Sequence, residues 1–219
     1  MDSRRITTTI AGEEIELLGD RGLFWPRKKL LFVADVHLGK EETFRSHGIG
    51  LPLGSLQESL LRLQRLVSFT KATELVVLGD LIHSRQGLTQ EVVSQVRAAK
   101  KSMAIPWSLV EGNHDRFLGE VAPIWELGLR GPSWQVGPFE FAHEPFSPSE
   151  ARGLHRVAGH LHPTVLLSGG GDRLRLPCFC IDNDQTLLPA FTTFSNGLIQ
   201  KKRPHRRLYV VADEQVIPL

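Results

Sequence analysis

Residues of the types that bind metal ions follow directly on five apolar segments of strand length. The five segments are Leu30–Ala34, Leu75–Leu78, Ser108–Val110, Phe139–Ala142 and Arg156–Ala158. The polar residues that follow them are Asp35, His37, Asp80, Asn113, His114, Asp115, His143, His160 and His162. Because ligands of α/β sheets bind at the carboxyl ends of strands, we expect these side chains to meet on one rim.

The donor atoms of these side chains suit a pair of divalent cations. Carboxylate, imidazole and amide groups together favour Mn²⁺, with Fe²⁺ or Zn²⁺ as alternatives, whereas structural zinc takes thiolates and Ca²⁺ takes oxygen. Asp80 lies alone between the Asp35-Val-His37 and Asn113-His114-Asp115 clusters, and from there it can give one oxygen to each ion. Two ions about 3.5–4 Å apart activate water as a nucleophile and clamp phosphoryl oxygens, which indicates phosphoester hydrolysis.

Each cluster by itself also fits a simpler interpretation. Asp-x-His occurs by chance, Gly-Asp is common in turns, and a lone histidine after an apolar strand, such as His143, is more often a satisfied core residue. The metal pair is favoured because all five clusters occur in one chain and in the same structural context.

The segments between the clusters predict the elements that position them. A helix is expected from Ser55 to Phe69, opened by a capping box of Ser55 and Glu58, and a second helix from Thr89 to Met103. Short strands dominate the second half, and Ile6–Trp25 adds a hairpin or an edge strand. The pattern predicts one domain over residues 1–219, an α/β sandwich of two mixed sheets flanked by helices.

The composition is that of an ordinary globular protein. Hydrophobic residues make up 41% and charged residues 23% of the 219 residues, and no apolar run approaches the length of about 20 needed to span a bilayer. Residues 1–12 lack the apolar stretch of a secretory signal, so we expect a cytoplasmic protein without a membrane partner. Cys178 and Cys180 are interpreted as core residues rather than as a metal site.

The net charge of +2 implies no partner, but basic residues are clustered. The clusters are Lys201, Lys202, Arg203, Arg206 and Arg207, and Arg27, Lys28 and Lys29. Such runs contact phosphates in some proteins, and more often they are solvated loops. The histidines outside the clusters, His47, His155 and His205, are interpreted as surface residues. The tryptophans are interpreted as packing residues, with base stacking as the alternative for Trp125.

The ordered series of clusters resembles the calcineurin-like metallophosphoesterase superfamily. The resemblance implies that one ion is held by Asp35, His37, Asp80 and His162. It implies that the other ion is held by Asp80, Asn113, His143 and His160, so that Asp80 bridges the two. It further implies that His114 contacts the phosphate and protonates the leaving oxygen, and that Asp115 orients His114.

The sequence around the clusters indicates which subfamily of this superfamily the chain resembles. The segment from Gly79 to His83 departs from the Asp-Arg-Gly pattern of the protein phosphatases, and His83 either lies beside the phosphate or is a turn histidine. Together with the motifs, Phe32–Lys40, Arg173–Cys178 and Leu188–Phe191 resemble the bacterial ligase-associated DNA-damage-response phosphoesterases, also called endonucleases. That resemblance implies DNA as substrate and a functional association with a DNA ligase and a helicase.

Three functional hypotheses follow. The first is a two-metal phosphodiester hydrolase that acts on DNA in repair, and the second is a phosphodiesterase or phosphatase for a small nucleotide. The third is a metal-bound interaction scaffold without turnover, against which the presence of His114 argues.

Overall fold

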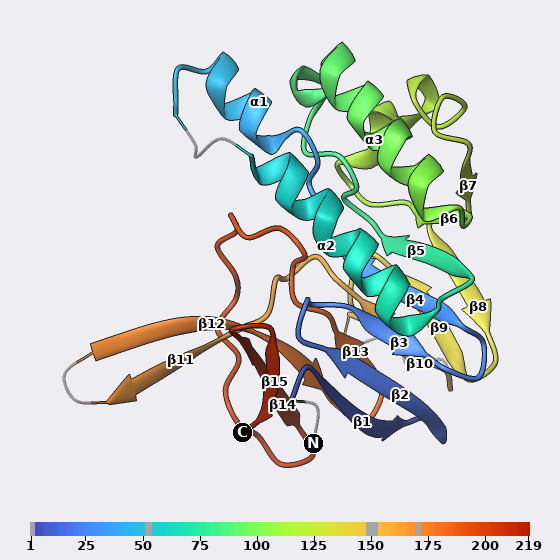
Figure 1. Cartoon of the computed structure of the whole chain (residues 1–219). Coiled ribbons are helices and arrows are strands. Elements are labelled where there is room, and N and C mark those ends of the chain that lie inside the picture. Colours follow the sequence, from blue (N-terminus) through green and yellow to red (C-terminus); the bar gives the residue numbers. More distant parts are fainter. Residues whose placement is uncertain (1–2, 51–53, 148–152, 170–171) are drawn as a thin grey trace.

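Two mixed sheets pack face to face in a computed structural model that describes residues 3–50, 54–147, 153–169 and 172–219 (Figure 1). The first sheet has the order β1 (Arg5–Ile10), β2 (Glu13–Leu18), β3 (Leu23–Trp25), β4 (Leu30–Ala34), β5 (Glu74–Leu78), β6 (Trp107–Val110) and β7 (Leu127–Leu129). Strands β1 to β4 pair antiparallel, and β4 to β7 pair parallel. Of the two alternatives predicted for Ile6–Trp25, a hairpin or an edge strand, the structure has the hairpin, and the strands that carry the first three clusters run parallel.

The second sheet combines parallel strands at its centre with antiparallel hairpins at both sides. Its order is β15 (Gln215–Pro218), β14 (Arg207–Ala212), β12 (Asp172–Ile181), β13 (Gln185–Leu187), β10 (His155–Ala158), β9 (Phe139–Ala142) and β8 (Ser133–Val136), and β11 (Thr164–Gly169) pairs with β12 alone. Strands β9, β10 and β13 run parallel. The predicted sandwich of two mixed sheets is confirmed.

Helices α2 (Ser55–Thr70) and α3 (Gln90–Met103) cover the outer face of the first sheet (Figure 1). Helix α1 (Lys40–Ser46) packs against a short 3₁₀ turn at Arg85–Gly87, and a second 3₁₀ turn spans Asp115–Glu120. Helices α2 and α3 agree with the prediction within one residue at each end. The side chain of Thr89 caps α3 by accepting a hydrogen bond from the Val92 amide at 3.2 Å.

The predicted capping box of α2 is wrong. The N-cap is Gly54, in a left-handed conformation, and not Ser55 as the capping box requires. Ser55 is therefore the first residue inside the helix. The Ser55 amide and hydroxyl both donate to the carboxylate of Glu41, at 3.1 and 2.8 Å. A partner from α1, which the sequence did not predict, thus replaces the local cap.

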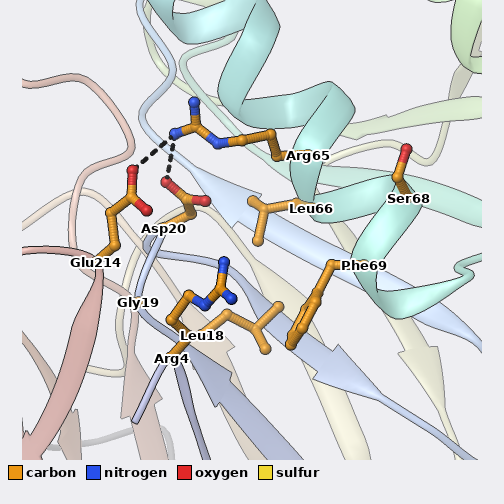
Figure 2. A pocket seen from close by; sticks show the side chains of 9 residues that line it. All are labelled: Arg4, Leu18, Gly19, Asp20, Arg65, Leu66, Ser68, Phe69 and Glu214. Carbon is orange, nitrogen blue, oxygen red and sulfur yellow. Dashed lines mark hydrogen bonds and ion pairs between the residues drawn. The ribbon is translucent and has the colours of Figure 1, made fainter. Parts of the chain in front are cut away.

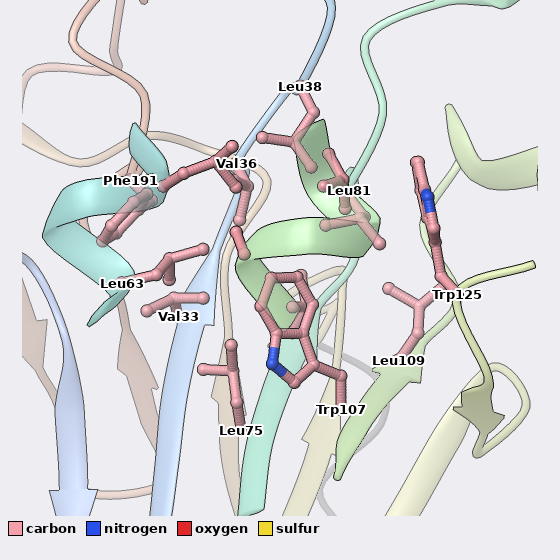
Figure 3. Packing of buried hydrophobic residues seen from close by; sticks show 14 of the residues in the cluster. Val33, Val36, Leu38, Leu63, Leu75, Leu81, Trp107, Leu109, Trp125 and Phe191 are labelled. Carbon is pink, nitrogen blue, oxygen red and sulfur yellow. The ribbon is translucent and has the colours of Figure 1, made fainter. Parts of the chain in front are cut away.

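Strands β4 to β6 are buried on both faces, as their continuous apolar sequences predicted. On the outer face, Val33, Leu75 and Trp107 pack under Leu63 of α2 and the residues of α3 (Figure 3). On the inner face, Phe32 meets the second sheet, where its ring stacks on Phe141 with centroids 4.2 Å apart. Because both sheets contribute to this inner cluster, we propose that residues 1–219 form a single domain.

Helix α2 is also tied to both sheets by charge. Arg65 bonds Asp20, in the turn after β2, at 3.1 Å and Glu214, in the turn between β14 and β15, at 3.2 Å (Figure 2). These groups line a cavity of about 350 Å³ together with Leu18, Leu66 and other residues. The carboxylates that Arg65 bonds are neutralised there, so we assign this cavity a structural role.

Of the remaining predictions on single residues, those on the cysteines and on three tryptophans are confirmed and one on a histidine is wrong. Cys178 and Cys180 are buried and reduced, and Trp25, Trp107 and Trp125 have at most 1% of their surface exposed, which excludes base stacking by Trp125. The surface assignment of His155 is wrong. His155 begins β10, is buried, and shares a hydrogen bond of 2.8 Å with the hydroxyl of Thr186.

No helix in the described part of the chain is both long enough and apolar enough to cross a membrane.

We predict that the α2 interface dominates stability. Leu63 is fully buried against the first sheet, so Leu63→Ala should lower the free energy of unfolding by about 2–5 kcal/mol. Leu61 lies on the same helix with 55% of its surface exposed, and Leu61→Ala should change that free energy by less than about 0.5 kcal/mol. Urea denaturation followed by circular dichroism measures both, and equal effects would contradict this packing.

Candidate metal centre

The residues of the five clusters converge on one rim of the sandwich. Each cluster leaves the carboxyl end of its strand, β4, β5 and β6 in the first sheet and β9 and β10 in the second. The rims of the two sheets meet where Ala34 bridges to Ala190 and the His160 amide donates to Oδ2 of Asp35 at 3.0 Å. All seven side chains predicted as metal ligands lie in this region. They are Asp35, His37, Asp80, Asn113, His143, His160 and His162.

One group of candidate ligands surrounds Asp35. Donor atoms of Asp35, His37 and His162 lie within 4.8 Å of one another, and Nε2 of His162 is 3.3 Å from Oδ1 of Asp35. Nδ1 of His162 lies 3.3 Å from the carbonyl of Asn196, to which it donates in the neutral tautomer. Nε2 then faces the carboxylate of Asp35, to which it donates when the ring is protonated and with which it can share a cation when the ring is neutral.

A second group surrounds His143. Nδ1 of His143 donates to the carbonyl of Leu78 at 3.1 Å, so in the neutral ring Nε2 carries a lone pair. Around this Nε2 lie Oδ1 of Asn113 at 2.9 Å, Nδ1 of His160 at 3.1 Å and Oδ1 of Asp80 at 3.5 Å. Neighbouring lone pairs repel unless protons or a metal ion separate them. The donor set therefore fits a divalent cation shared by these groups.

Asp80 stands between the two groups. Its Oδ2 lies 3.8 Å from Nε2 of His37, and its Oδ1 lies 3.5 Å from Nε2 of His143. The amide of His114 also donates to Oδ1 at 3.0 Å, which fixes the carboxylate in this orientation. One oxygen thus faces each group, which is the geometry that a bridging ligand needs.

Backbone strain marks the same residues. Asp35, His37, Asp80, His160 and His162 all have φ between 46° and 66°, in the left-handed region that residues with a side chain seldom adopt. Such strain persists only where the surrounding structure enforces it, and it concentrates at functional sites. Here it turns successive side chains out of the pleat toward the rim.

Two glycines permit the close approach of the clusters. A Cβ atom on Gly79 would lie 2.2 Å from Nδ1 of His143, and one on Gly159 would lie 2.6 Å from Oδ2 of Asp35. Both distances are far below van der Waals contact, so only glycine at these positions allows the ends of β5 and β10 to approach ligands that the opposite sheet carries.

Burial controls the protonation of the imidazoles. Desolvation lowers the pKa of His37 to about 2, with the charge of Lys40 as the next cause. Desolvation also lowers the pKa of His83 to about 4. Burial acts in the same sense on His162, but the hydrogen bond to Asp35 and its charge outweigh it and raise the pKa. His37 is therefore neutral at physiological pH, as a metal ligand must be.

The role that the resemblance implied for Asp115 is wrong. Nδ1 of His114 is held by the carbonyl of His83 at 2.9 Å, and not by Asp115. The Asp115 carboxylate instead accepts from the amides of Asp80 at 2.7 Å, Gly112 at 2.9 Å and Leu81 at 3.0 Å. Burial raises its pKa to about 6 although these amides act in the opposite sense. Asp115 thus fixes the loop that presents Asp80.

His83 lies beside His37 and His114. Its ring stacks on that of His114, with centroids 5.8 Å apart and planes 13° apart, and meets the edge of His37 at 5.3 Å. Its Nδ1 is buried and has no hydrogen-bond partner among the described residues. His83 therefore supports His114 through both its ring and its carbonyl.

Lys40 is a site residue that the sequence reasoning missed. Its ammonium group donates to the carbonyl of Phe194 and lies near enough to His37 and His83 to lower the pKa of each. It stands three residues after His37 at the start of α1, and this proximity to a metal-type cluster was the available signal. A cation there can contact a phosphate.

A cavity of about 460 Å³ opens beside the second group. Asn113 and His143 form part of its wall, and Glu111, Glu144 and Arg156 form other parts. The cavity of Figure 2 includes none of the cluster residues. The cavity of about 460 Å³ thus lies beside the rim, on the side of β8 and β9.

The sandwich and its rim of metal donors define a metal-dependent phosphoesterase. The family model of the calcineurin-like phosphoesterases matches residues 28–190, and the chain belongs to that family. The crystal structure of Pseudomonas putida nuclease MPE is 33% identical, covers 98% of this chain and 100% of its own, and superposes with a TM-score of 0.83. A phosphoesterase from E. coli, Yfce, is 18% identical over 84% of this chain and 88% of its own, with a TM-score of 0.44. No curated protein matches the sequence significantly.

We predict that Asp80→Ala is the most damaging single change at the rim. It removes a carboxylate whose two oxygens face His37 and His143 separately, so the metal content should fall to one ion or none per chain and activity should be lost. Elemental analysis of the purified variant measures this, with Asp184→Ala, an exposed aspartate away from the rim, as control. Two ions retained per Asp80→Ala chain would contradict the bridging geometry.

Proposed function

We propose that this protein is a two-metal phosphodiesterase that cleaves DNA. The observation that carries the proposal is the convergence of imidazole, carboxylate and amide groups at the rim, where Oδ2 of Asp80 faces His37 and Oδ1 faces His143. The choice of a nucleic acid over other phosphoesters is supported by the likeness to the nuclease from P. putida, which extends over nearly the whole of both chains.

The ligand sets follow the two groups. Asp35, His37, Asp80 and His162 would hold one ion, and Asp80, Asn113, His143 and His160 the other. When bound, the ions supply a water nucleophile at neutral pH and neutralise the charge of the phosphoryl oxygens. We propose Mn²⁺ as the native metal, with Fe²⁺ or Zn²⁺ as alternatives, because the donors mix imidazole nitrogen with oxygen.

His114 supplies the proton for the leaving group. Its Nδ1–H bond to the His83 carbonyl fixes the ring, so that an imidazolium presents Nε2–H as the acid. His83 stacks behind it, and Asp115 holds the loop between them through backbone amides. Lys40 contributes a positive charge that attracts the phosphate to this side of the rim.

A phosphodiesterase for a small nucleotide is the alternative that uses the same chemistry. The DNA-cleaving and the small-nucleotide functions differ in whether substrate contacts outside the metal centre contribute to hydrolysis. A comparison of substrates tests this. The scaffold hypothesis is disfavoured because His114 is present and held in place. A role in DNA repair and an association with a DNA ligase and a helicase stay predictions from the resemblance, and a cytoplasmic location stays a prediction from the N-terminal sequence.

We predict that His114→Ala separates metal binding from chemistry. Both ions should remain bound, because His114 lies outside the two groups, while the rate should fall by about 10²- to 10⁴-fold on DNA. The loss should be smaller with bis-p-nitrophenyl phosphate, because nitrophenolate leaves without a proton. His205→Asn, at an exposed histidine, serves as control. An equal loss on both substrates would assign His114 to phosphate binding instead of proton transfer.

We predict that the enzyme prefers diesters to monoesters. A phosphomonoester carries an additional negative charge and lacks a second arm that can lie along the surface. With Mn²⁺, hydrolysis of bis-p-nitrophenyl phosphate and DNA should therefore exceed that of p-nitrophenyl phosphate, as initial rates measure. Hydrolysis of the monoester faster than that of the diester would favour the small-nucleotide alternative. Hydrolysis of cyclic nucleotides faster than that of single- and double-stranded DNA would favour it as well.

A further inference from the structure

A two-stranded arm begins at the metal centre. Strand β11 starts at Thr164, two residues after His162, and pairs with β12 to form a hairpin. Figure 1 shows that this hairpin projects from the body of the protein. Only the inner end of β12 joins the second sheet, where Cys178 to Ile181 pair with β14. The outer half of the hairpin is thus attached rigidly at the rim and covered by neither sheet.

The outer half of the arm is exposed on both faces. The register pairs Leu166 with Arg175 and Ser168 with Arg173, which places both arginines on one face. The opposite face carries the pair Leu167 and Leu174, which have 38% and 56% of their surface exposed. Because an isolated two-stranded ribbon is at best marginally stable in water, an arm of this kind is expected to act against a partner.

A second basic segment adjoins the root of the arm. Residue Ile199 bridges to Thr164, and the Gln200 amide bonds the Thr164 carbonyl at 2.7 Å. The next residues are Lys201, Lys202 and Arg203, all exposed. No ion pair with a described residue involves these three cations or the two arginines of the arm.

The other two basic residues of the C-terminal cluster have structural partners. Arg206 forms a bidentate pair with Asp182, with Nε–Oδ1 at 2.8 Å and Nη2–Oδ2 at 2.6 Å. Arg207 donates to the Thr8 hydroxyl at 2.7 Å and to the Thr9 carbonyl at 2.9 Å. The cluster that the sequence presents as one unit is therefore divided, and only its first three members are available to a ligand.

We propose that the β11–β12 arm and Lys201–Arg203 form a backbone clamp that holds a nucleic-acid strand beside the metal centre. The inference rests on the proposed nuclease function and adds the surface that positions the polymer. The proposal is based on charge, because five exposed cations flank the chain segment that supplies His160 and His162. Arginines on a β-ribbon and lysines on a loop contact phosphates without reading sequence.

The test uses the full chain loaded with Mn²⁺ and the double variant Arg173→Gln/Arg175→Gln. Fluorescence anisotropy with a labelled DNA duplex and single strand measures affinity at several salt concentrations. The salt slope should decrease by about two, one for each phosphate that the variant no longer neutralises. DNA cleavage should slow, whereas hydrolysis of bis-p-nitrophenyl phosphate should stay unchanged because that substrate does not reach the arm. Lys201→Gln/Lys202→Gln should behave in the same way.

A matched control removes the same charge elsewhere. Lys28 and Lys29 are exposed and precede β4, whereas Asp35 follows it, so they lie about 17 Å from the rim along the strand. Lys28→Gln/Lys29→Gln should leave the salt slope unchanged. Equal slopes in wild type, control and both clamp variants would overturn the clamp while the nuclease function stands. A wild type that hydrolyses the small diester but neither binds nor cleaves DNA would overturn the proposed function itself.

The exposed leucines of the arm allow a second test, which distinguishes a nucleic-acid clamp from a contact between two copies of the chain. If the arm joined two copies of the chain, Leu167→Ser/Leu174→Ser would lower the mass in sedimentation without affecting DNA binding. That result, together with unchanged slopes in the arginine variant, would replace the clamp by a contact between chains. An unchanged mass and a reduced slope in the arginine variant support the clamp.

Discussion

Imidazole nitrogens and carboxylate and amide oxygens lie crowded together at the rim, and the rest of the structure holds them there. Nε2 of His143 faces an amide oxygen, an imidazole nitrogen and a carboxylate oxygen within 3.5 Å. Such a cluster is unfavourable by itself and favourable around cations, because the ions convert repulsion between acceptors into shared attraction. The fold must therefore hold these groups together with energy from elsewhere.

That energy comes from the packing of the two sheets and of the helices outside them. Aromatic contacts such as Phe32 on Phe141 fix the sheets face to face and bring their carboxyl ends into line. The strained φ angles at Asp35, Asp80 and His160 are maintained because each of these residues follows a strand buried on both faces. Stability in the core thus compensates strain at the rim, and glycines at 79 and 159 remove the steric barrier that would remain.

Carbonyl groups of the main chain orient the imidazoles that surround the centre. His143, His162 and His114 each place Nδ1 against a carbonyl, of Leu78, Asn196 and His83 respectively. Each such bond selects the tautomer and aims Nε2 away from the backbone. The Asp115 carboxylate accepts hydrogen bonds from backbone amides rather than from an imidazole, so it fixes the loop that carries Asp80. The carbonyl of His83 instead orients the ring of His114.

The amino-acid sequence by itself determined the five strands that precede the polar clusters, the two long helices and the seven candidate metal ligands that meet at the rim. These features are local, because apolar runs followed by Asp, His or Asn record burial and chemistry within a few residues. Only the tertiary structure decided which group bonds which: Ser55 with Glu41 instead of its own helix, His155 with Thr186 in the core, and His114 with the His83 carbonyl. It likewise separated Arg206, bound to Asp182, from the exposed Lys201. The physical reason is that a hydrogen-bonding group takes the partner that folding brings within about 3 Å, and sequence spacing does not specify that distance.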